Sequence, residues 1–411
     1  GNKEELNTWY GGDGYCAMHW NPTNSSNGRY TELYDYSGKE SYSCIYRYCD
    51  EGGMASMSSM HWKVVAWNGI ITVEISDNSS DSSYIYTVEN DKYKAGYIGF
   101  YSLTYAGNTS LKIDNLTIDG YKIKNDNEEI LSGIWTDDFS ENSIDRYTVT
   151  GPDNGIFGDW QVSGGLLRVT GTSAASNWWT TTLLLDGVNY ENFVMEFDAE
   201  VSTGYGVVFR GQDDGKTAGT GFNTWYGGNT YVLMHHNPAD ASSGEYMALY
   251  DFNGEKTLIK SFGSPGTMGA LKKVHWILTA NENNIIVNVS NSEGEESYTY
   301  SIENIGYSNG SIGFYNTTRS GVTSLKIDNL TVTPINNIYE NDFSDSKTID
   351  DFYTAGPDSG EWGTWQIADS HLQVTGNTGA KWWGSSLISN EKYDNFVMEF
   401  DAESTAGYGL I

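Results

Sequence analysis

Several features are scarce in this chain of 411 residues. It has 6 prolines and 3 cysteines, and only 23 lysines and arginines stand against 54 aspartates and glutamates. Long apolar runs are also rare, whereas glycine, tyrosine and tryptophan are abundant. This composition favours many short strands joined by turns over helices. We therefore expect an all-β protein.

The shortage of basic residues leaves a net charge of −31. Such a charge repels nucleic acid and anionic membrane surfaces, so neither is expected as a partner, and no direct membrane insertion is expected. An excess of carboxylates favours bound divalent cations. The alternative is a solvated acidic surface, and charge alone does not locate a calcium site.

The three cysteines are Cys16, Cys44 and Cys49. Cys44 and Cys49 bracket a short loop and could close a small disulfide in an extracellular chain. Their spacing is not a zinc signature. The sequence also lacks a nucleophile elbow, a P-loop, a dinucleotide fingerprint and a zincin helix, so none of these motifs indicates an enzyme.

One motif organises the chain. The sequence Asn-Phe-Val-Met-Glu-Phe-Asp-Ala-Glu at 192–200 returns at 395–403, and a Gly-Tyr-Gly stretch follows each copy. At a period of two, alternate residues of the motif fall on opposite faces. This pattern predicts a half-buried strand that leads into a second strand.

The repeat defines three segments. Residues 1–134 match the second part of a repeat, residues 135–336 form the one complete repeat, and residues 337–411 restart the pattern. For example, Ser-Leu-Lys-Ile-Asp-Asn-Leu-Thr occurs at both 110–117 and 324–331. The sequence therefore predicts tandem β-sandwich repeats of roughly 200 residues.

The two partial repeats are complementary. Together they supply a whole repeat apart from the eight residues equivalent to 209–216. Half a sandwich cannot bury its apolar face, so something must complete it. The chain is either a window cut from a longer array, or its halves assemble within one chain or head to tail. We favour an array or filament of copies in which neighbours supply the missing half.

A chain that begins inside a repeat gives no information on leaders or anchors. No signal peptide and no transmembrane stretch is visible, but this absence excludes nothing about the location of the protein.

The order of motifs along the complete repeat is familiar. It includes Gly-Val-Val-Phe-Arg at 206–210, Asp-Asp-Gly at 213–215, His-Trp-Ile-Leu at 275–278 and Ile-Asp-Asn-Leu at 327–330. This order resembles the concanavalin-A-like, laminin-G-like jelly rolls. Within them, it is most similar to fructan-binding carbohydrate-binding modules and related sugar-processing domains of bacterial secreted proteins.

The resemblance implies a fold, a location and particular residues. It implies a jelly-roll sandwich and an extracellular or cell-surface protein that binds polysaccharide or glycan. Arg210 stands where the family often has a sugar ligand. Asp138 and Asp328 stand where related sandwiches clamp a structural calcium between their first and last strands.

The residues themselves also indicate a sugar site. Sugars are recognised by aromatic faces and by planar side chains that make paired hydrogen bonds to vicinal hydroxyls. Such groups are expected to converge in the complete repeat. The predicted carbohydrate-binding residues are Arg210, Asp213, Asp214, Trp225, Tyr226, Trp178, Trp179 and His235.

Each of these residues has a structural alternative. Of two adjacent tryptophans on a strand, 178 and 179, one points away from the core, but it could pack under a loop. Trp225 could belong to the core, and Arg210 could pair with a nearby acid. His235 could be a hydrogen-bonded strand residue, because its neighbour His236 is replaced by Trp20 in the first repeat.

Carboxylate pairs suggest a possible enzyme. Glu196 with Asp198, and Glu399 with Asp401, share a strand face at a spacing of roughly 6.5–7 Å, which resembles glycosidase geometry. No third partner is evident in the sequence, so we favour an ordinary solvent-facing row.

Taken together, these features predict a non-catalytic extracellular or cell-surface protein that binds carbohydrate, mediates adhesion, or does both. The first alternative is a structural fibre or filament built from copies of the chain. The second alternative is a glycoside-processing enzyme. Calcium is the one cofactor that the sequence suggests, in a structural role.

Overall fold

The computed structural model divides the chain into two compact units. Unit 1 comprises Gly1–Leu131 with Asn336–Ile411, and unit 2 comprises Ser132–Ile335. Strands dominate both units, which confirms the predicted all-β class. In the described parts, no helix is long and apolar enough to cross a membrane. The described residues are 13–23, 28–37, 42–123, 134–151, 155–176, 179–212, 229–236, 246–262, 271–291, 296–303, 306–355 and 361–411.

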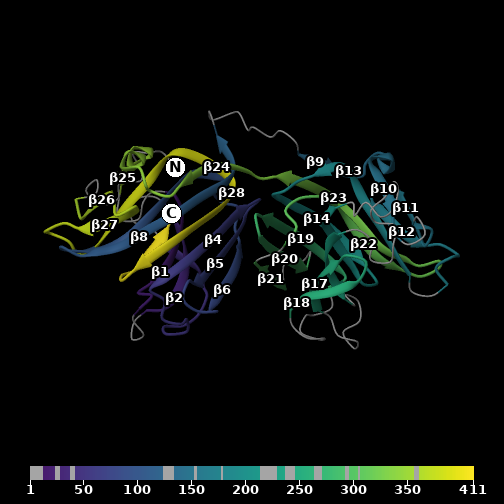
Figure 1. The fold of residues 1–411 in the computed structure, drawn as a ribbon, viewed down its shortest axis with the longest axis horizontal. Helices are drawn as coiled ribbons and strands as arrows, with labels where there is room; N and C mark the ends of the chain where they lie inside the picture. Colours follow the sequence, from purple (N-terminus) through teal and green to yellow (C-terminus); the bar gives the residue numbers. More distant parts are fainter. Residues whose placement is uncertain are drawn as a thin grey trace. The chain divides into compact units, whose positions relative to one another are not determined.

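Unit 2 is a sandwich of two antiparallel sheets (Figure 1). Its front sheet has the order β10-β13-β22-β15-β16-β17-β18, and its back sheet has the order β11-β12-β23-β14-β19-β20-β21, with β9 pairing β23. The elements of unit 2 are β9 (Trp135–Asp137), the 3-10 helix η1 (Ile144–Arg146), β10 (Tyr147–Thr150), β11 (Gly158–Val162), β12 (Leu167–Gly171), β13 (Trp179–Asn189), β14 (Phe193–Val201), β15 (Tyr205–Gln212), β16 (Asn229–His236), β17 (Tyr246–Phe252), β18 (Lys256–Phe262), β19 (Lys273–Asn281), β20 (Asn284–Asn291), β21 (Ser297–Ile302), β22 (Ser311–Thr318) and β23 (Thr323–Pro334).

Unit 1 has the same two layers, but its strands come from both ends of the chain. The front layer is β25, the first part of β28, β7, β29, β1, β2 and β3. The back layer is β26, β27, β8, the rest of β28, β4, β5 and β6, with β24 pairing β8. The elements of unit 1 are β1 (Gly14–Trp20), β2 (Tyr30–Tyr36), β3 (Tyr42–Arg47), β4 (Ser59–Trp67), β5 (Ile70–Asp77), β6 (Ser83–Glu89), β7 (Ala95–Tyr105), β8 (Thr109–Ile123), β24 (Asn336–Asn341), the 3-10 helix η3 (Ser346–Asp351), β25 (Phe352–Ala355), β26 (Gly363–Ala368), β27 (His371–Gly376), β28 (Lys381–Ser404) and β29 (Tyr408–Leu410).

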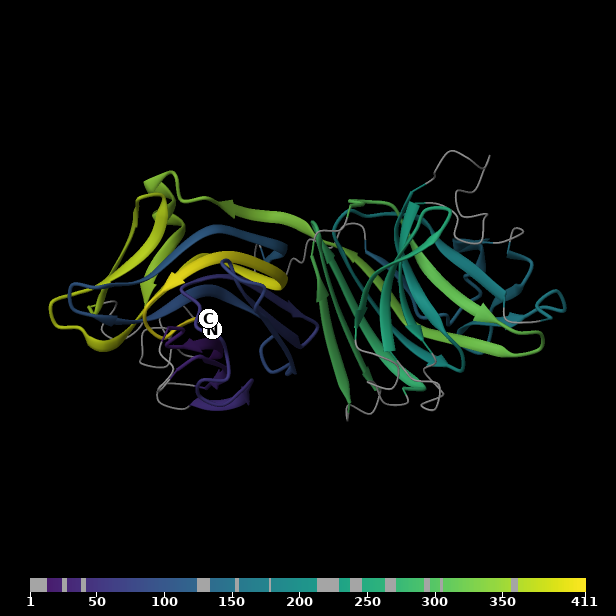
Figure 2. The same cartoon turned by 60° about the horizontal axis from the view of Figure 1, so that its bottom comes forward.

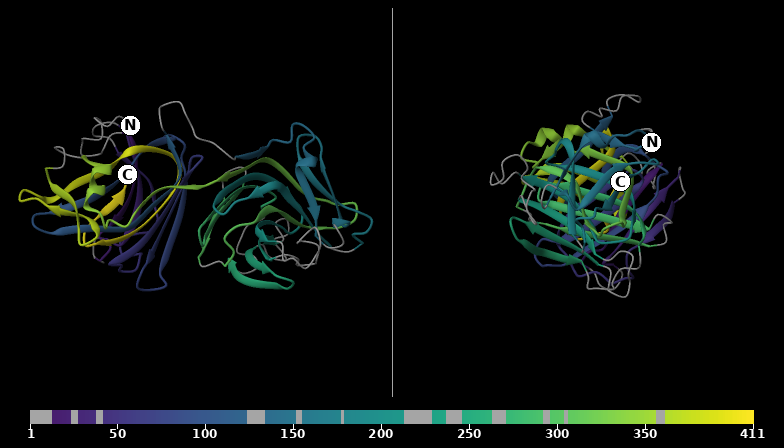
Figure 3. Two further views of the ribbon diagram at one scale, coloured as in Figure 1. Left: turned by 45° about the horizontal axis from the view of Figure 1, so that its top comes forward. Right: turned by 90° about the vertical axis from the view of Figure 1, so that its right-hand side faces the viewer.

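Strand β28 joins the two distant segments of unit 1. It pairs antiparallel with β4, β7 and β8, and β29 lies between β1 and β7. Figures 2 and 3 show the yellow C-terminal strands among the purple and blue N-terminal strands. The sequence argument favoured a neighbouring chain as the supplier of the missing half. In this structure, the same chain supplies it.

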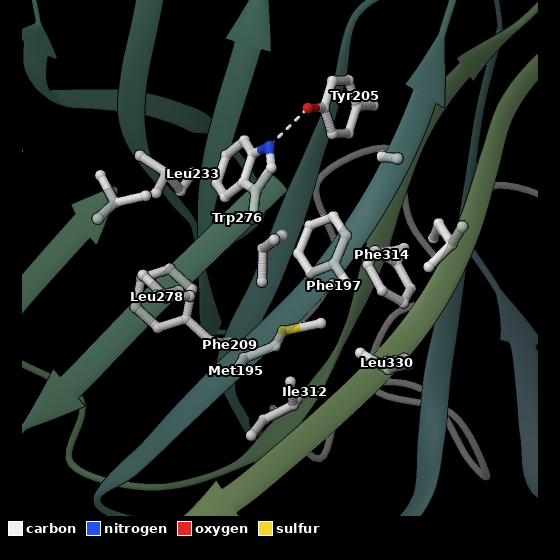
Figure 4. Close-up of a cluster of buried hydrophobic side chains, with 14 of the residues drawn as sticks. Met195, Phe197, Tyr205, Phe209, Leu233, Trp276, Leu278, Ile312, Phe314 and Leu330 are labelled. Atoms are coloured by element: carbon white, nitrogen blue, oxygen red, sulfur yellow. Dashed lines mark hydrogen bonds between the residues drawn. The ribbon is translucent and has the colours of Figure 1, made fainter. Parts of the chain in front are cut away.

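The core of each unit lies between its layers. Along β14, the period of two separates two faces, and Met195 and Phe197 lie on the inward one. Phe197 stacks on Trp276 with ring centroids 5.6 Å apart. The indole nitrogen of Trp276 donates to the hydroxyl of Tyr205 at 2.7 Å (Figure 4). Burial of these rings is a major source of stability.

Unit 1 repeats this arrangement. Phe400 stacks on Trp62 at 5.7 Å, and the Trp62 indole donates to the Tyr408 hydroxyl at 2.7 Å. Because Trp62 comes from β4 while its two partners come from the last strands, the core of unit 1 is built across the two segments.

Matched substitutions should lower the stability of one unit at a time. We expect Phe400→Ala to lower the free energy of unfolding of unit 1 by about 3–5 kcal/mol, and Phe197→Ala to do the same for unit 2, because each leaves a cavity in its own core. Calorimetry measures the stability of the variants, and mapping of proteolytic sites shows which unit unfolds. A result in which either variant weakens both units equally would contradict independent cores.

Candidate functional site

The structure buries two of the predicted sugar ligands. Arg210 is fully buried, and its guanidinium donates to the backbone carbonyls of Tyr307 at 3.0 Å and Glu191 at 3.1 Å. Burial lowers the pKa of Arg210. A surface sugar cannot reach this side chain, so the prediction that Arg210 binds sugar directly is corrected to a role in holding the fold.

His235 is also fully buried, and its Nδ1 lies 3.3 Å from the Tyr205 hydroxyl. Burial lowers its pKa to about 3. His236, the next residue, points to the outer face of the sheet and lies 3.1 Å from the hydroxyl of Tyr250. The two histidines therefore form no joint site, and His235 is a hydrogen-bonded strand residue rather than a sugar ligand.

Among the predicted aromatic and acidic ligands, only Trp179 can be placed. It is half-buried and stacks on Phe157 with ring centroids 4.7 Å apart. In unit 1, Trp382 occupies the position of residue 178 and is 57% exposed. The other predicted residues, Trp178, Asp213, Asp214, Trp225 and Tyr226, lie outside the described residues.

The two predicted calcium ligands each hold a backbone amide. The carboxylate of Asp138 accepts from the N–H of Ser140 at 3.0 Å, and that of Asp328 accepts from the N–H of Asn329 at 2.9 Å. Within the described parts of the chain, no group of three His, Cys, Asp or Glu side chains is arranged to hold a metal ion. Calcium usually takes six or more oxygen ligands, including carbonyls and water, so a calcium ion at Asp138 and Asp328 stays a prediction.

The predicted carboxylate pairs surround a histidine. On the outer face of the back sheet, His275 Nδ1 lies 2.9 Å from Asp198 Oδ1, and its Nε2 lies 3.3 Å from Glu196 Oε1. The second oxygen of Asp198 accepts from Asn329 at 2.7 Å. The hydrogen bonds to Asp198 and Glu196 raise the pKa of His275 to about 9, so it is an imidazolium at neutral pH.

We call this arrangement, a charged histidine between an aspartate and a glutamate, the imidazolium clamp. It recurs in unit 1. His61 lies 3.1 Å from Asp401 and 3.5 Å from Glu399. Burial opposes its charge, but the hydrogen bonds to the two carboxylates outweigh this and raise its pKa to about 9. Because both carboxylates serve as counter-ions in each unit, we interpret these pairs as structural rather than as a glycosidase pair.

A polar cluster that the sequence analysis missed lies on the outer face of the front layer in unit 1. Glu32 of β2 is 1% exposed and accepts from Trp20 Nε1 at 2.7 Å and from Arg47 Nε at 2.6 Å. It also accepts a hydrogen bond from the Tyr34 hydroxyl. Strands β1, β2 and β3 run side by side, so they bring these groups together. We call Trp20, Tyr30, Glu32, Tyr34 and Arg47 the Glu32 cluster.

Aromatic rings surround the guanidinium of this cluster. Arg47 lies 4.8 Å above the ring of Tyr30, and the hydrogen bond with Glu32 raises the pKa of Arg47. Tyr42 is 51% exposed and makes an edge contact with Tyr34 at 5.6 Å. Glu32 is hidden, whereas the side chain of Arg47 is 46% exposed. The surface therefore presents a fixed guanidinium beside aromatic rings.

Unit 2 lacks this ion pair. In the strand register, Ala248 and Ser261 face each other where unit 1 has Glu32 and Arg47. His236 instead stacks on Tyr246 at 4.5 Å, and Lys256 Nζ lies 4.0 Å from the ring centre of Tyr250. A sequence signal existed for the difference. A glutamate stands between two tyrosines at a spacing of two in one repeat, and an alanine replaces it in the other.

The cysteines of unit 1 are free thiols. Cys16 is buried, Cys44 is exposed and Cys49 is half-buried. Cys44 Sγ lies 3.3 Å from the carbonyl of Tyr46 and 3.8 Å from Glu32, so it borders the Glu32 cluster instead of pairing with Cys49.

No family model matches the chain, and no curated protein matches it. Among solved structures, it is similar to lectin II from Ulex europaeus at 12% identity and a TM-score of 0.37, over 50% of this chain and 99% of that chain. It is similar to a legume lectin-like domain from Entamoeba histolytica at 11% identity and a TM-score of 0.36, over 46% of this chain and 91% of that chain. A third is the VIP36 exoplasmic/lumenal domain, Ca2+/Man3GlcNAc-bound form, at 8% identity and a TM-score of 0.32, over 46% of this chain and 83% of that chain. Likeness at this level assigns no ligand to this chain.

The imidazolium clamps predict a loss of stability in mild base. The folded pKa of about 9 for His61 and His275 lies above the ordinary value of 6.5. The stabilisation is therefore complete below pH 6.5 and is lost as pH rises through 9. We expect the free energy of unfolding to fall across this window in urea titrations. The double variant His61→Asn with His275→Asn should show a flatter profile there. An identical slope in both proteins would contradict the clamp.

Proposed function

We propose that the chain is a non-catalytic carbohydrate-binding protein and that the Glu32 cluster of unit 1 is its sugar site. The observation that carries the proposal is the partly exposed side chain of Arg47, held by the hidden carboxylate of Glu32 beside Trp20 and Tyr30. Sugar binding needs a rigid planar donor next to aromatic faces, and the outer face of β1, β2 and β3 offers both.

Each residue has a separate part in this proposal. Glu32 is a positioning residue, because its oxygens accept from Arg47, Trp20 and Tyr34 and it is too buried to meet a ligand. Arg47 has five N–H donors, of which those on Nε and Nη2 turn to Glu32 at 2.6 and 2.5 Å. Its remaining donors suit a pair of vicinal hydroxyls. Trp20 and Tyr42 offer ring surface for the C–H face of a sugar.

Charge selects the class of sugar. At a net charge of −31 the protein repels anionic glycans, so neutral polysaccharides are the proposed ligands. Fructans are the first to test, because the repeat motifs resemble fructan-binding modules. An extracellular or cell-surface location and adhesion rest on the same resemblance, and they remain part of the proposal. Self-association has no support from the half-repeats, because unit 1 is completed within one chain.

Substitution of Arg47 is the direct test. We expect Arg47→Ala to weaken binding to a neutral polysaccharide at least tenfold, because hydrogen bonds from a charged group contribute about 1.5–3 kcal/mol. Affinity gel electrophoresis in inulin, levan and other neutral polysaccharides measures the effect. Glu32→Gln should also weaken binding, while Glu32→Asp should restore part of it if the carboxylate acts by holding Arg47.

The matched control is Lys326→Ala. Lys326 is also a cation paired with a glutamate, since its Nζ lies 2.8 Å from Glu200 Oε1, but it belongs to unit 2 and lies outside the Glu32 cluster. Its removal should leave binding unchanged. Equal retention of binding by the Arg47 and Lys326 variants would reject the Glu32 cluster as the sugar site.

A further inference from the structure

A row of aromatic and apolar side chains leads away from the Glu32 cluster across the front layer of unit 1. At its near end, Trp20 stacks on Tyr30 with ring centroids 6.4 Å apart. Gly407 lies beside Trp20, and a Cβ added to this glycine would meet the Trp20 ring at 3.2 Å and the Leu103 side chain at 3.1 Å. The glycine therefore lets side chains from β1 and β7 approach each other over the chain that runs between them.

The row continues along β7 to Tyr105, which comes two residues after Leu103 and therefore lies on the same face of the strand. The Tyr105 ring contacts that of Trp382 at a centroid distance of 5.3 Å. Tyr105 is 42% exposed and Trp382 is 57% exposed, so the far end of the row is a pair of open rings. We call Tyr30, Trp20, Leu103, Tyr105 and Trp382 the front row.

The backbone of Trp382 has an unfavourable conformation. Its φ is 63°, in the left-handed region that large side chains seldom adopt. Lys381 pairs with Tyr105 and Trp383 pairs with Thr104, so Trp382 is the extra residue of a β-bulge. A bulge re-aims one side chain, and this one aims an indole at solvent. Because the exposed indole buries little apolar area, packing does not explain the strain, which points to a contact outside the chain.

Unit 2 does not repeat the row. The amide of Thr317 donates to the carbonyl of Gly204 at 3.0 Å, as the amide of Leu103 does to that of Gly407 at 2.8 Å, so Thr317 is the equivalent of Leu103. Two residues later, Arg319 stands in place of a tyrosine. A Cβ added to Gly204 would meet one backbone oxygen at 3.7 Å and no described side chain within 4 Å. The front row is therefore particular to unit 1.

We infer that the front row extends the sugar site into a binding surface for an internal stretch of a neutral polysaccharide, whose rings lie in sequence from Arg47 to Trp382. The inference rests on the proposed function, because Arg47 stands at the near end of the row. Five strand spacings separate β3 from β28, which amounts to roughly 24 Å. A span of this length holds several linked sugar rings, so a disaccharide contacts only part of it.

The two ends of the row contribute different interactions. Arg47 presents a guanidinium to the hydroxyls of one sugar, and Tyr105 and Trp382 offer ring faces to the C–H surface of a sugar further along the chain. Leu103 and Trp20 provide an uncharged floor between them. The ligand is neutral, because the net charge of −31 repels anionic glycans.

The test measures affinity against the length of the sugar chain. Oligosaccharides of inulin, levan, xylan and β-glucan, from disaccharide to octasaccharide, are titrated into the 411-residue chain by isothermal titration calorimetry. We expect the affinity to keep rising beyond the disaccharide, because each added ring reaches a further part of the row. Trp382→Ala should weaken binding of the octasaccharide roughly threefold to tenfold and leave the disaccharide unchanged, because only the longer chain reaches this indole.

Two further variants separate the row from the fold. Trp382→Gly suits a φ of 63°, so it should keep the melting temperature of the wild type while it loses the same part of the octasaccharide affinity. Leu258→Ala removes another apolar side chain, one that is 52% exposed but belongs to unit 2. This matched control should change no affinity.

The outcomes distinguish the row from the site at its near end. If Arg47→Ala loses binding while Trp382→Ala binds every length like the wild type, the front row is rejected and the sugar site at the Glu32 cluster stands. An affinity that is the same from disaccharide to octasaccharide has the same meaning. Failure of all four series to bind would overturn the sugar site and the row together. Self-association in light scattering that Trp382→Ala abolishes, without an effect on octasaccharide binding, would assign the row to a second copy of the chain instead.

Discussion

The pairing of β28 with β4, β7 and β8 is the interaction on which unit 1 depends. It brings Phe400 onto Trp62, and β29 brings the Tyr408 hydroxyl to the same indole. Without these strands, the inner faces of the first eight strands would be left in water. Unit 2 makes the same contacts from one continuous segment, so the two units share a core and differ in the connectivity that completes it.

The two units share some polar contacts and differ in others. Both units keep the indole-to-hydroxyl bond of the core and the imidazolium clamp of the back sheet. The outer face of the front layer differs, because Glu32 of unit 1 is replaced by Ala248 in unit 2. Features common to both units belong to the fold. The buried carboxylate of Glu32 occurs in only one unit, and its hydrogen bonds to Trp20, Tyr34 and Arg47 satisfy it there.

The periodicity and the repeat allowed the fold to be predicted from the sequence. The candidate site could not be predicted in the same way. The alternation in β14 predicted a strand with one buried face, and the structure shows that Met195 and Phe197 lie on it. Arg210 was expected to bind sugar because it stands where the resembling family often has a sugar ligand. Its burial depends on two backbone carbonyls from distant segments, and no local pattern reveals them. Glu32 and Arg47 were missed for the same reason, because only the register of β2 with β3 places them together.

The pairing of β9 with β23 has a consequence for how the chain folds. Trp135 lies opposite Val332, so the chain enters and leaves unit 2 at neighbouring strands. The two segments of unit 1 are separated by the whole of unit 2, and closing so long a loop costs entropy that grows with the logarithm of its length. Once unit 2 has folded, its ends are held one strand apart, which reduces that cost by about 2–3 kcal/mol. A folded unit 2 thus holds the strands after residue 336 close to the strands before residue 131, and it lowers the entropic cost of pairing them.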